Sequence, residues 1–342
     1  MSGPILIWGA GAIGGTIGAY LVRVGEDVQF VDTAADHVAA MQRDGLTIEG
    51  PIETLTVPVQ AVLPQDLSGT FSRILLCVKA HHTESASVAL APHLAAGGYV
   101  ASFQNGLNEF VIGRVLGIDN VIGAFINFGA DYIAPGRILY GGKGACVLGE
   151  LDGRISPRVT ALHAVLTSFE PDAMLTEDIL GYLWGKLGYG ALLFATALTD
   201  ASIADVLASE RHRPVLAALA REVMAVAGTK GIKPRGFNGF DPAAFGQDGT
   251  EAAIDASMSE MVVHNRRSAK SHSGIWRDLA VRKRKTEVDA QLGPILTEAA
   301  ALGLAVPVMT QLIAMIHEIE NGSRSLAWDN LDDLALSMAG DA

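Results

Sequence analysis

One segment near the start of the chain constrains the fold more than any other. Residues 9–14 read GAGAIG, directly after an apolar, strand-like run at residues 5–8 and before a stretch with helical spacing. In that setting Gly9 permits a tight turn, Gly11 lets the backbone approach a pyrophosphate, and Gly14 lets helix and strand pack closely. The amino terminus of the helix adds unpaired N–H groups and the positive end of a dipole. We therefore predict a dinucleotide site with contacts from Gly9, Gly11, Ala12, Ile13 and Gly14.

Short β-rich runs alternate with helical stretches through the first half of the chain. We expect buried strands at Ile5–Trp8, Val28–Val31, Ile74–Val78, Val100–Phe103 and Val121–Phe125. Strands that alternate with helices indicate an α/β fold with a doubly wound parallel sheet. The segment Gly136–Gly149 alternates differently and is expected to form a hairpin or edge strands that close the sheet.

The second half of the chain changes character near residue 178. Ala- and Leu-rich helical stretches follow at Ile179–Thr199, Val215–Thr229, Thr286–Leu302 and Val308–Asn321. Lys230–Gly249 reads as an irregular insertion, and the residues after Asn321 as a short helix or tail. Because 342 residues are too many for one ordinary core, we predict two domains. These are a Rossmann-type dinucleotide-binding domain over 1–175 and an all-helical substrate and dimerisation domain over 176–342.

Composition narrows the function classes. A net charge of −12 with mixed signs argues against nucleic-acid binding, which needs a sustained basic surface. No run of about 18 apolar residues predicts a membrane span, and the amino terminus does not resemble a signal peptide, so we expect a cytoplasmic protein. Cys77 and Cys146 lack metal-ligand spacing, and no histidine pattern resembles a metal site, so we expect free thiols and no metal.

The basic run Arg277–Lys285 leaves three interpretations open: a solvated helix face, an oligomer contact, or a grip on an anionic substrate. Large apolar helical domains often pair, which leaves a homodimer open as well.

Asp32 ends the second expected strand, where an acidic side chain reaches the ribose hydroxyls of an adenosine. A carboxylate there repels a 2′-phosphate, and Thr33 follows rather than an arginine. The pattern favours NAD over NADP. Asp is also common at solvated strand ends, which is the alternative interpretation.

Four further motifs follow the glycine loop in order. Cys77-Val78-Lys79-Ala80 comes after the third run, Gln104-Asn105-Gly106 after the fourth, and Trp184-Gly185-Lys186 opens the first long helix; Thr286-Glu287-Val288-Asp289 comes near the end. With the glycine loop, this order resembles ketopantoate reductases (2-dehydropantoate 2-reductases) from residue 5 to about residue 319. The resemblance implies hydride transfer between a nicotinamide cofactor and the carbonyl or hydroxyl carbon of a small molecule that bears a carboxylate.

The resemblance also implies roles for particular residues. Lys186 matches the lysine that gives a proton to the ketone oxygen, and Glu287 matches a glutamate at the reacting end of the site. Lys79 and Asn105 match residues that line the cofactor ribose, and Asn105 the substrate also. Ser273 lies near the family's substrate-contacting serine.

The residues themselves leave alternatives for these roles. Lys186 lies in an apolar helical stretch, where burial lowers a lysine pKa toward the range useful for proton transfer, although a lysine can also extend to water. Glu287 could instead be an ordinary acid in a first helical turn.

The chain departs from the family where asparagines usually hold the substrate. Those positions, one and two turns after Lys186 and another farther on, are Gly190, Phe194 and Ala204. They cannot supply the same hydrogen bonds, so we expect a 2-oxo or 2-hydroxy acid other than ketopantoate, in either reaction direction. An opine-type dehydrogenase, which joins an amine to a keto acid, and a non-catalytic dinucleotide sensor remain alternatives.

Overall fold

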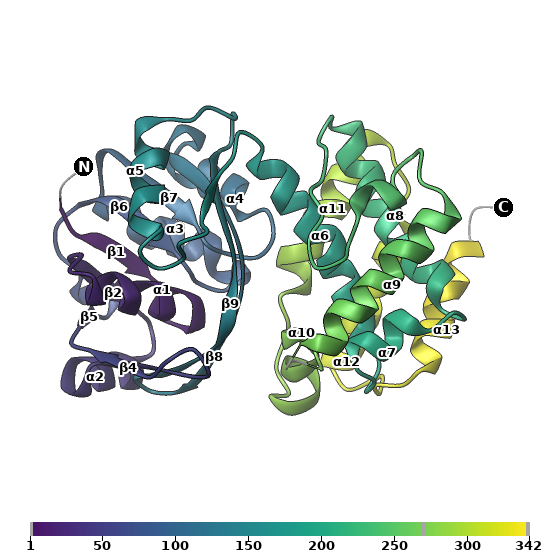
Figure 1. Ribbon diagram of the computed structural model, residues 1–342, viewed down its shortest axis with the longest axis horizontal. Coiled ribbons are helices and arrows are strands. Elements are labelled where there is room, and N and C mark those ends of the chain that lie inside the picture. The colour runs from purple at the N-terminus through teal and green to yellow at the C-terminus, as the bar shows by residue number, and fades with distance from the viewer. Residues whose placement is uncertain (1–2, 269–270, 340–342) are drawn as a thin grey trace. The chain divides into compact units, whose positions relative to one another are not determined.

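The computed structural model describes residues 3–268 and 271–339. The chain divides into two compact units, Met1–Ile179 and Leu180–Ala342 (Figure 1). The roles predicted for 1–175 and 176–342, dinucleotide binding and substrate binding with dimerisation, stay predictions.

The first unit is built on a sheet whose centre is parallel. Its strands run in the order β4-β3-β9-β8-β7-β6-β1-β2-β5, with β10 paired to β9. All pairs from β8 to β5 in this order are parallel, whereas β8 and β9 form a long antiparallel hairpin. The strands are β1 (Ile5–Trp8), β2 (Val28–Val31), β3 (Leu46–Glu49), β4 (Leu55–Val57), β5 (Gln60–Val62), β6 (Phe71–Leu76), β7 (Leu94–Ser102), β8 (Val121–Ala134), β9 (Arg137–Glu150) and β10 (Met174–Leu175).

Helices cover both faces of this sheet because alternate strand residues point to opposite faces. Ile5 and Ile7 of β1 belong to one apolar core, with side chains of α1, α2 and α5. Leu6 and Trp8 belong to the other, with side chains of α3 and α4. The helices of this unit are α1 (Ala12–Arg23), α2 (Ala35–Asp44), α3 (Thr83–Leu90), α4 (Asn108–Leu116) and α5 (Pro157–Leu166).

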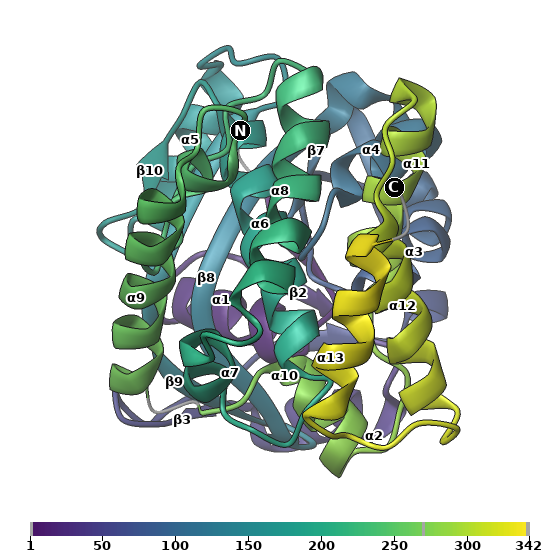
Figure 2. The same ribbon diagram turned by 90° about the vertical axis from the view of Figure 1, so that its right-hand side faces the viewer.

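The second unit is helical (Figure 2). Its helix α8 contacts α11, α12 and α13, while α9 contacts α7. The helices are α6 (Ile179–Thr196), α7 (Ile203–Ala208), α8 (Arg213–Thr229), α9 (Glu251–Arg267), α10 (Gly274–Trp276), α11 (Val288–Leu302), α12 (Pro307–Glu320) and α13 (Asp329–Leu336). The predicted class, a doubly wound parallel sheet followed by an all-helical part, is confirmed.

The hairpin expected at Gly136–Gly149 is confirmed, whereas the alternative of edge strands is wrong. The segment after Gly136 forms one arm of a hairpin, but it is not an edge, because β9 lies between β8 and β3; β4 and β5 form the edges. The elements that were not expected are the strands β3, β4, β5 and β10 and the helices α5, α7, α9 and α10. No helix in the described part of the chain is long and apolar enough to cross a membrane.

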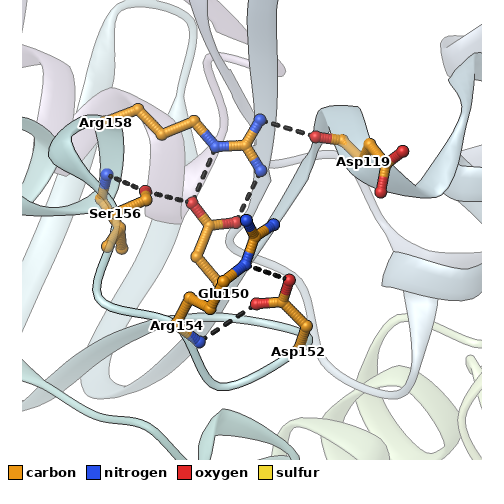
Figure 3. Close-up of polar contacts among 7 residues, drawn as sticks. Asp119, Glu150, Asp152, Arg154, Ser156 and Arg158 are labelled. Atoms are coloured by element: carbon orange, nitrogen blue, oxygen red, sulfur yellow. Dashed lines mark hydrogen bonds and ion pairs between the residues drawn. The ribbon is translucent and has the colours of Figure 1, made fainter.

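A buried ion pair ties the end of β9 to α5 (Figure 3). Arg158 binds both carboxylate oxygens of Glu150, with Nε–Oε1 and Nη2–Oε2 distances of 2.7 and 2.6 Å. The same guanidinium donates to the carbonyl oxygen of Asp119 at 2.6 Å, just before β8 begins. Ser156 also donates to Glu150. Only 5% of the Glu150 side chain is exposed, so this carboxylate depends on these partners.

Candidate functional site

The loops with predicted cofactor contacts gather at the carboxyl edge of the parallel sheet. Gly9 follows β1, Asp32 follows β2, Lys79 follows β6 and Asn105 follows β7. Strand β1 lies between β2 and β6, so the strand order reverses here. In open α/β sheets, ligands bind outside the carboxyl ends of the strands at such a reversal.

The three glycines of the loop meet different requirements. Gly9 has φ +99°, and a Cβ there would lie 2.9 Å from the backbone nitrogen of Val78. A Cβ on Gly14 would overlap the carbonyl oxygen of Gly9. A Cβ on Gly11 would meet no heavy atom within 4 Å. Gly9 and Gly14 are therefore needed for the turn and the packing, whereas Gly11 leaves open space at the amino end of α1, as an approaching pyrophosphate requires.

The carboxylate of Asp32 is held by backbone groups on both oxygens. Oδ2 accepts from the Ala10 N–H at 2.8 Å, and Oδ1 accepts from the Ala34 N–H at 3.0 Å. The first bond fastens the glycine loop to the end of β2. Each oxygen keeps a second lone pair for a further donor such as a ribose hydroxyl.

A buried polar network joins the two loops that carry Lys79 and Asn105. The Gln104 amide donates to the Val78 carbonyl oxygen at 3.0 Å and to the Thr83 hydroxyl at 2.8 Å. That hydroxyl lies 2.7 Å from the amide oxygen of Asn108, whose nitrogen donates to the carbonyl oxygen of Asn105 at 2.6 Å. Lys79 and Asn105 are both exposed, so the network sets their backbone and leaves their side chains accessible.

Helix α6 has one half-buried face. Tyr182, Lys186, Gly190 and Leu193 are half-buried, whereas the residues between them are buried. Their spacing of three or four residues places all four on one side of the helix, which we call the α6 stripe. A Cβ on Gly190 would meet no heavy atom within 4 Å. The lysine matched to proton transfer and the glycine at the first substituted asparagine position thus share one accessible face.

On another side of α6, two glycines lie against the backbone of residue 235. Arg235 donates its N–H to the carbonyl oxygen of Gly181 at 2.8 Å. A Cβ on Gly185 would overlap the carbonyl oxygen of Arg235. The glycine before Lys186 therefore lets the chain around residue 235 lie directly on the helix.

Glu287 is 9% exposed and immediately precedes α11. Its neighbour Thr286 donates from both N–H and hydroxyl to Oε1 of Glu320, each at 2.7 Å. Oε2 of Glu320 lies 3.0 Å from Nδ1 of His317. This hydrogen bond between the imidazole and the carboxylate raises the pKa of His317. A buried carboxylate from the end of α12 thus holds the backbone next to Glu287.

Three other predicted substrate residues lie in packed surroundings. Phe194 is fully buried, and Ala204 is 7% exposed. The Ser273 hydroxyl accepts from the Trp276 N–H at 3.1 Å and caps α10. Their contacts with substrate stay predictions.

Sequence reasoning missed His37, in the first turn of α2. Its ring is buried and contacts the glycine loop, with Nε2 3.0 Å from the carbonyl oxygen of Ala10. Within residues 3–268 and 271–339, no group of three or more His, Cys, Asp or Glu side chains is arranged to hold a metal ion.

Together, the glycine loop at the strand reversal and the helical unit with a half-buried lysine define a dinucleotide-dependent oxidoreductase. Comparison with known proteins identifies the family. The family model for "Ketopantoate reductase PanE/ApbA" matches residues 5–153, and the model for the C-terminal part of the same family matches residues 178–320. The chain belongs to the ketopantoate reductase family, whose members are NAD(P)-dependent oxidoreductases acting on a carbonyl or hydroxyl group.

Relatives extend over nearly the whole chain. A 2-dehydropantoate 2-reductase of Archaeoglobus fulgidus is 28% identical over 321 residues, 93% of this chain and 98% of that protein. The crystal structure of a PanE/ApbA family ketopantoate reductase from Ralstonia eutropha has TM-score 0.80 at 25% identity, over 94% of this chain and 99% of that one. A D-mandelate dehydrogenase, solved with NADH and anilino(oxo)acetate, has TM-score 0.80 at 21% identity over 94% of this chain and 99% of that one.

Proposed function

We propose that this protein transfers hydride between NAD(H) and a 2-oxo or 2-hydroxy acid whose side chain is larger and less polar than that of ketopantoate. The observation that carries the proposal is the α6 stripe. It presents Lys186 beside Gly190, where the helix offers open space instead of the amide expected in the family. The domain roles predicted from sequence belong to the same proposal.

The preference for NAD(H) rests on Asp32. Its carboxylate is fixed by the N–H groups of Ala10 and Ala34 and cannot turn away from a 2′-phosphate without losing both bonds. Repulsion between two unit charges about 5 Å apart costs about 1–3 kcal/mol at an effective dielectric constant of about 20–80. That penalty corresponds to a preference of roughly 5- to 100-fold for NAD(H).

The cofactor fits the first unit at Gly9–Gly14, where Gly11 leaves the approach to the amino end of α1 open. When bound, the nicotinamide supplies or accepts the hydride. Reduction of a ketone also needs one proton, which the Lys186 ammonium donates to the oxygen as negative charge develops there. In the oxidative direction the neutral amine takes that proton back. We assign Glu287 to holding the ammonium, and Lys79 and Asn105 to the ribose and the substrate.

The substrate class follows from missing hydrogen-bond partners. A site built with asparagines favours a hydroxylated substrate, because buried amides left unpaired cost free energy. Gly190 and Ala204 remove such amides. The chain is similar in structure to a D-mandelate dehydrogenase that was solved with NADH and anilino(oxo)acetate. Aryl 2-oxo acids are therefore the first compounds to test.

The test is a matched panel of 2-oxo acids, each assayed with NADH and with NADPH. The panel contains ketopantoate, branched aliphatic acids and aryl acids such as benzoylformate. We expect kcat/KM to be highest for an aryl or branched acid with NADH, and at least about 10-fold lower for ketopantoate. Efficient ketopantoate reduction with NADPH would contradict both parts of the proposal. Light scattering on the same preparation tests whether the chain forms a homodimer.

A further inference from the structure

The glycine loop is held at Ala10 from two directions. The Ala10 N–H donates to Asp32, and the Ala10 carbonyl oxygen lies 3.0 Å from Nε2 of His37. Ala10 itself is fully buried. The N–H belongs to the peptide plane between Gly9 and Ala10, and the carbonyl belongs to the plane between Ala10 and Gly11. Two successive peptide planes of the loop are therefore fixed by side chains from outside it.

The other ring nitrogen of His37 determines which tautomer makes this contact. Nδ1 lies 2.9 Å from the backbone nitrogen of Gly136, and that N–H can only donate. Nδ1 must therefore carry the lone pair, so the proton is on Nε2 and is donated to the Ala10 carbonyl. The ring is 1% exposed and packs edge-on against Tyr132, with ring centroids 5.1 Å apart.

The position of Gly136 explains why the ring can reach both partners. Gly136 lies in the turn between β8 and β9 with φ +72°. A Cβ there would lie 3.2 Å from the Cβ of Ala40, one turn beyond His37 in α2. The hairpin turn thus packs directly against α2, and the imidazole connects it to the glycine loop.

We propose that His37 is a positioning residue for dinucleotide binding, a role that rests on the proposed cofactor site at Gly9–Gly14. In a trans peptide the N–H points opposite to the carbonyl. Holding the Ala10 carbonyl therefore sets the direction of the Gly11 N–H, at the amino end of α1. Glycine has the most backbone freedom to lose, so a loop ordered in advance binds its ligand more tightly than one that must be ordered by it.

Two substitutions separate the two ring contacts. In His37→Asn the amide oxygen can take the place of Nδ1 and accept from Gly136, while the bond to Ala10 is lost. In His37→Gln the amide nitrogen can take the place of Nε2 and donate to Ala10, while the bond to Gly136 is lost. Each variant loses one buried hydrogen bond. If the role of His37 were merely structural, the melting temperature would fall in both variants and the Kd for NADH would change equally in both.

The measurement is the Kd for NADH of the full chain by titration calorimetry, at a temperature where circular dichroism shows each variant folded. We expect a roughly 3- to 10-fold rise in Kd for His37→Asn and less than about a 2-fold rise for His37→Gln. Under saturating NADH, kcat should be unchanged in both. Equal rises in the two variants, or no rise in either, would overturn the proposal. If His37→Asn does not fold, a rise above about 2-fold in His37→Gln alone overturns it.

A third variant distinguishes this proposal from the site on which it rests. A Cβ at Gly11 meets no heavy atom within 4 Å, so we expect Gly11→Val to fold but to fill the space assigned to the pyrophosphate. If Gly11→Val binds NADH as the native chain does, the cofactor site itself is wrong. If Gly11→Val loses binding while His37→Asn does not, only the role of His37 fails.

Discussion

Replacing Gly190 by asparagine tests the substrate proposal on the α6 stripe. A Cβ at this position meets no heavy atom within 4 Å, so the helix has room where the new side chain begins. Asparagine is also about 0.3 kcal/mol better than glycine inside a helix. We therefore expect the melting temperature of Gly190→Asn to be equal to or slightly above that of the native chain.

The effect on specificity can be worked out from hydrogen bonding and volume. For ketopantoate, a new amide partner contributes about 1 kcal/mol. For an aryl 2-oxo acid, the amide fills space and loses its own partners, at a cost of about 2 kcal/mol. The two effects sum to about 3 kcal/mol, so the ratio of kcat/KM for ketopantoate to that for the aryl acid should rise about 100-fold.

Steady-state assays with NADH measure this ratio, and Gly228→Asn provides the matched control. Gly228 is also in a helix, α8, and a Cβ there also meets no heavy atom within 4 Å. The control should leave the ratio unchanged. If Gly190→Asn folds but its ratio stays within about 3-fold of the native value, residue 190 does not contact substrate and the reasoning is refuted.

Three further predictions concern stability. Arg158→Met leaves the buried Glu150 carboxylate without its charged partner and should lower the free energy of unfolding in urea by about 3–5 kcal/mol. Arg154→Met, which breaks an exposed pair, should lower it by at most about 1 kcal/mol, and similar costs in the two variants would contradict this prediction. Burial raises the pKa of Glu222 to about 7 from 4.5, although the N–H groups at the start of α12 oppose the shift. The Glu222 carboxyl therefore loses its proton at a lower pH in the unfolded chain than in the folded chain. The free energy of unfolding should fall as pH rises from about 4.5 to about 7, and this fall should be smaller in Glu222→Gln. Gly185→Ala should destabilise the chain by about 1–3 kcal/mol because its Cβ overlaps the carbonyl of residue 235, and an unchanged melting temperature would show that the segment yields freely.

The carboxyl edge of the sheet could be predicted from sequence because its determinants are local. The strand at residues 5–8, the glycines after it and Asp32 at the end of the next strand each carry their signal within a few residues. The strands β4 and β5 were missed because each has only three residues, too few to establish an alternating pattern. Helix α9 did leave a signal: Thr250 caps it, and Ile254, Met258 and Met261 follow at helical spacing.

The role of His37 could not be predicted because it depends on long-range pairing. Its two ring partners, Ala10 and Gly136, lie 27 and 99 residues away in the chain. The same holds for Glu320, which binds Thr286 across 34 residues. The match of a residue to a family position also does not predict how its side chain packs. Phe194 is fully buried, and Ser273 caps a helix.

The central claim is that Lys186 moves the proton that accompanies hydride transfer. The most direct measurement is single-turnover oxidation of bound NADH by the best 2-oxo acid of the panel, in the native chain and in Lys186→Met. We predict a rate about 100- to 10,000-fold lower in the variant, with the Kd for NADH unchanged. A variant that folds, binds NADH and turns over within a few-fold of the native rate would contradict the account.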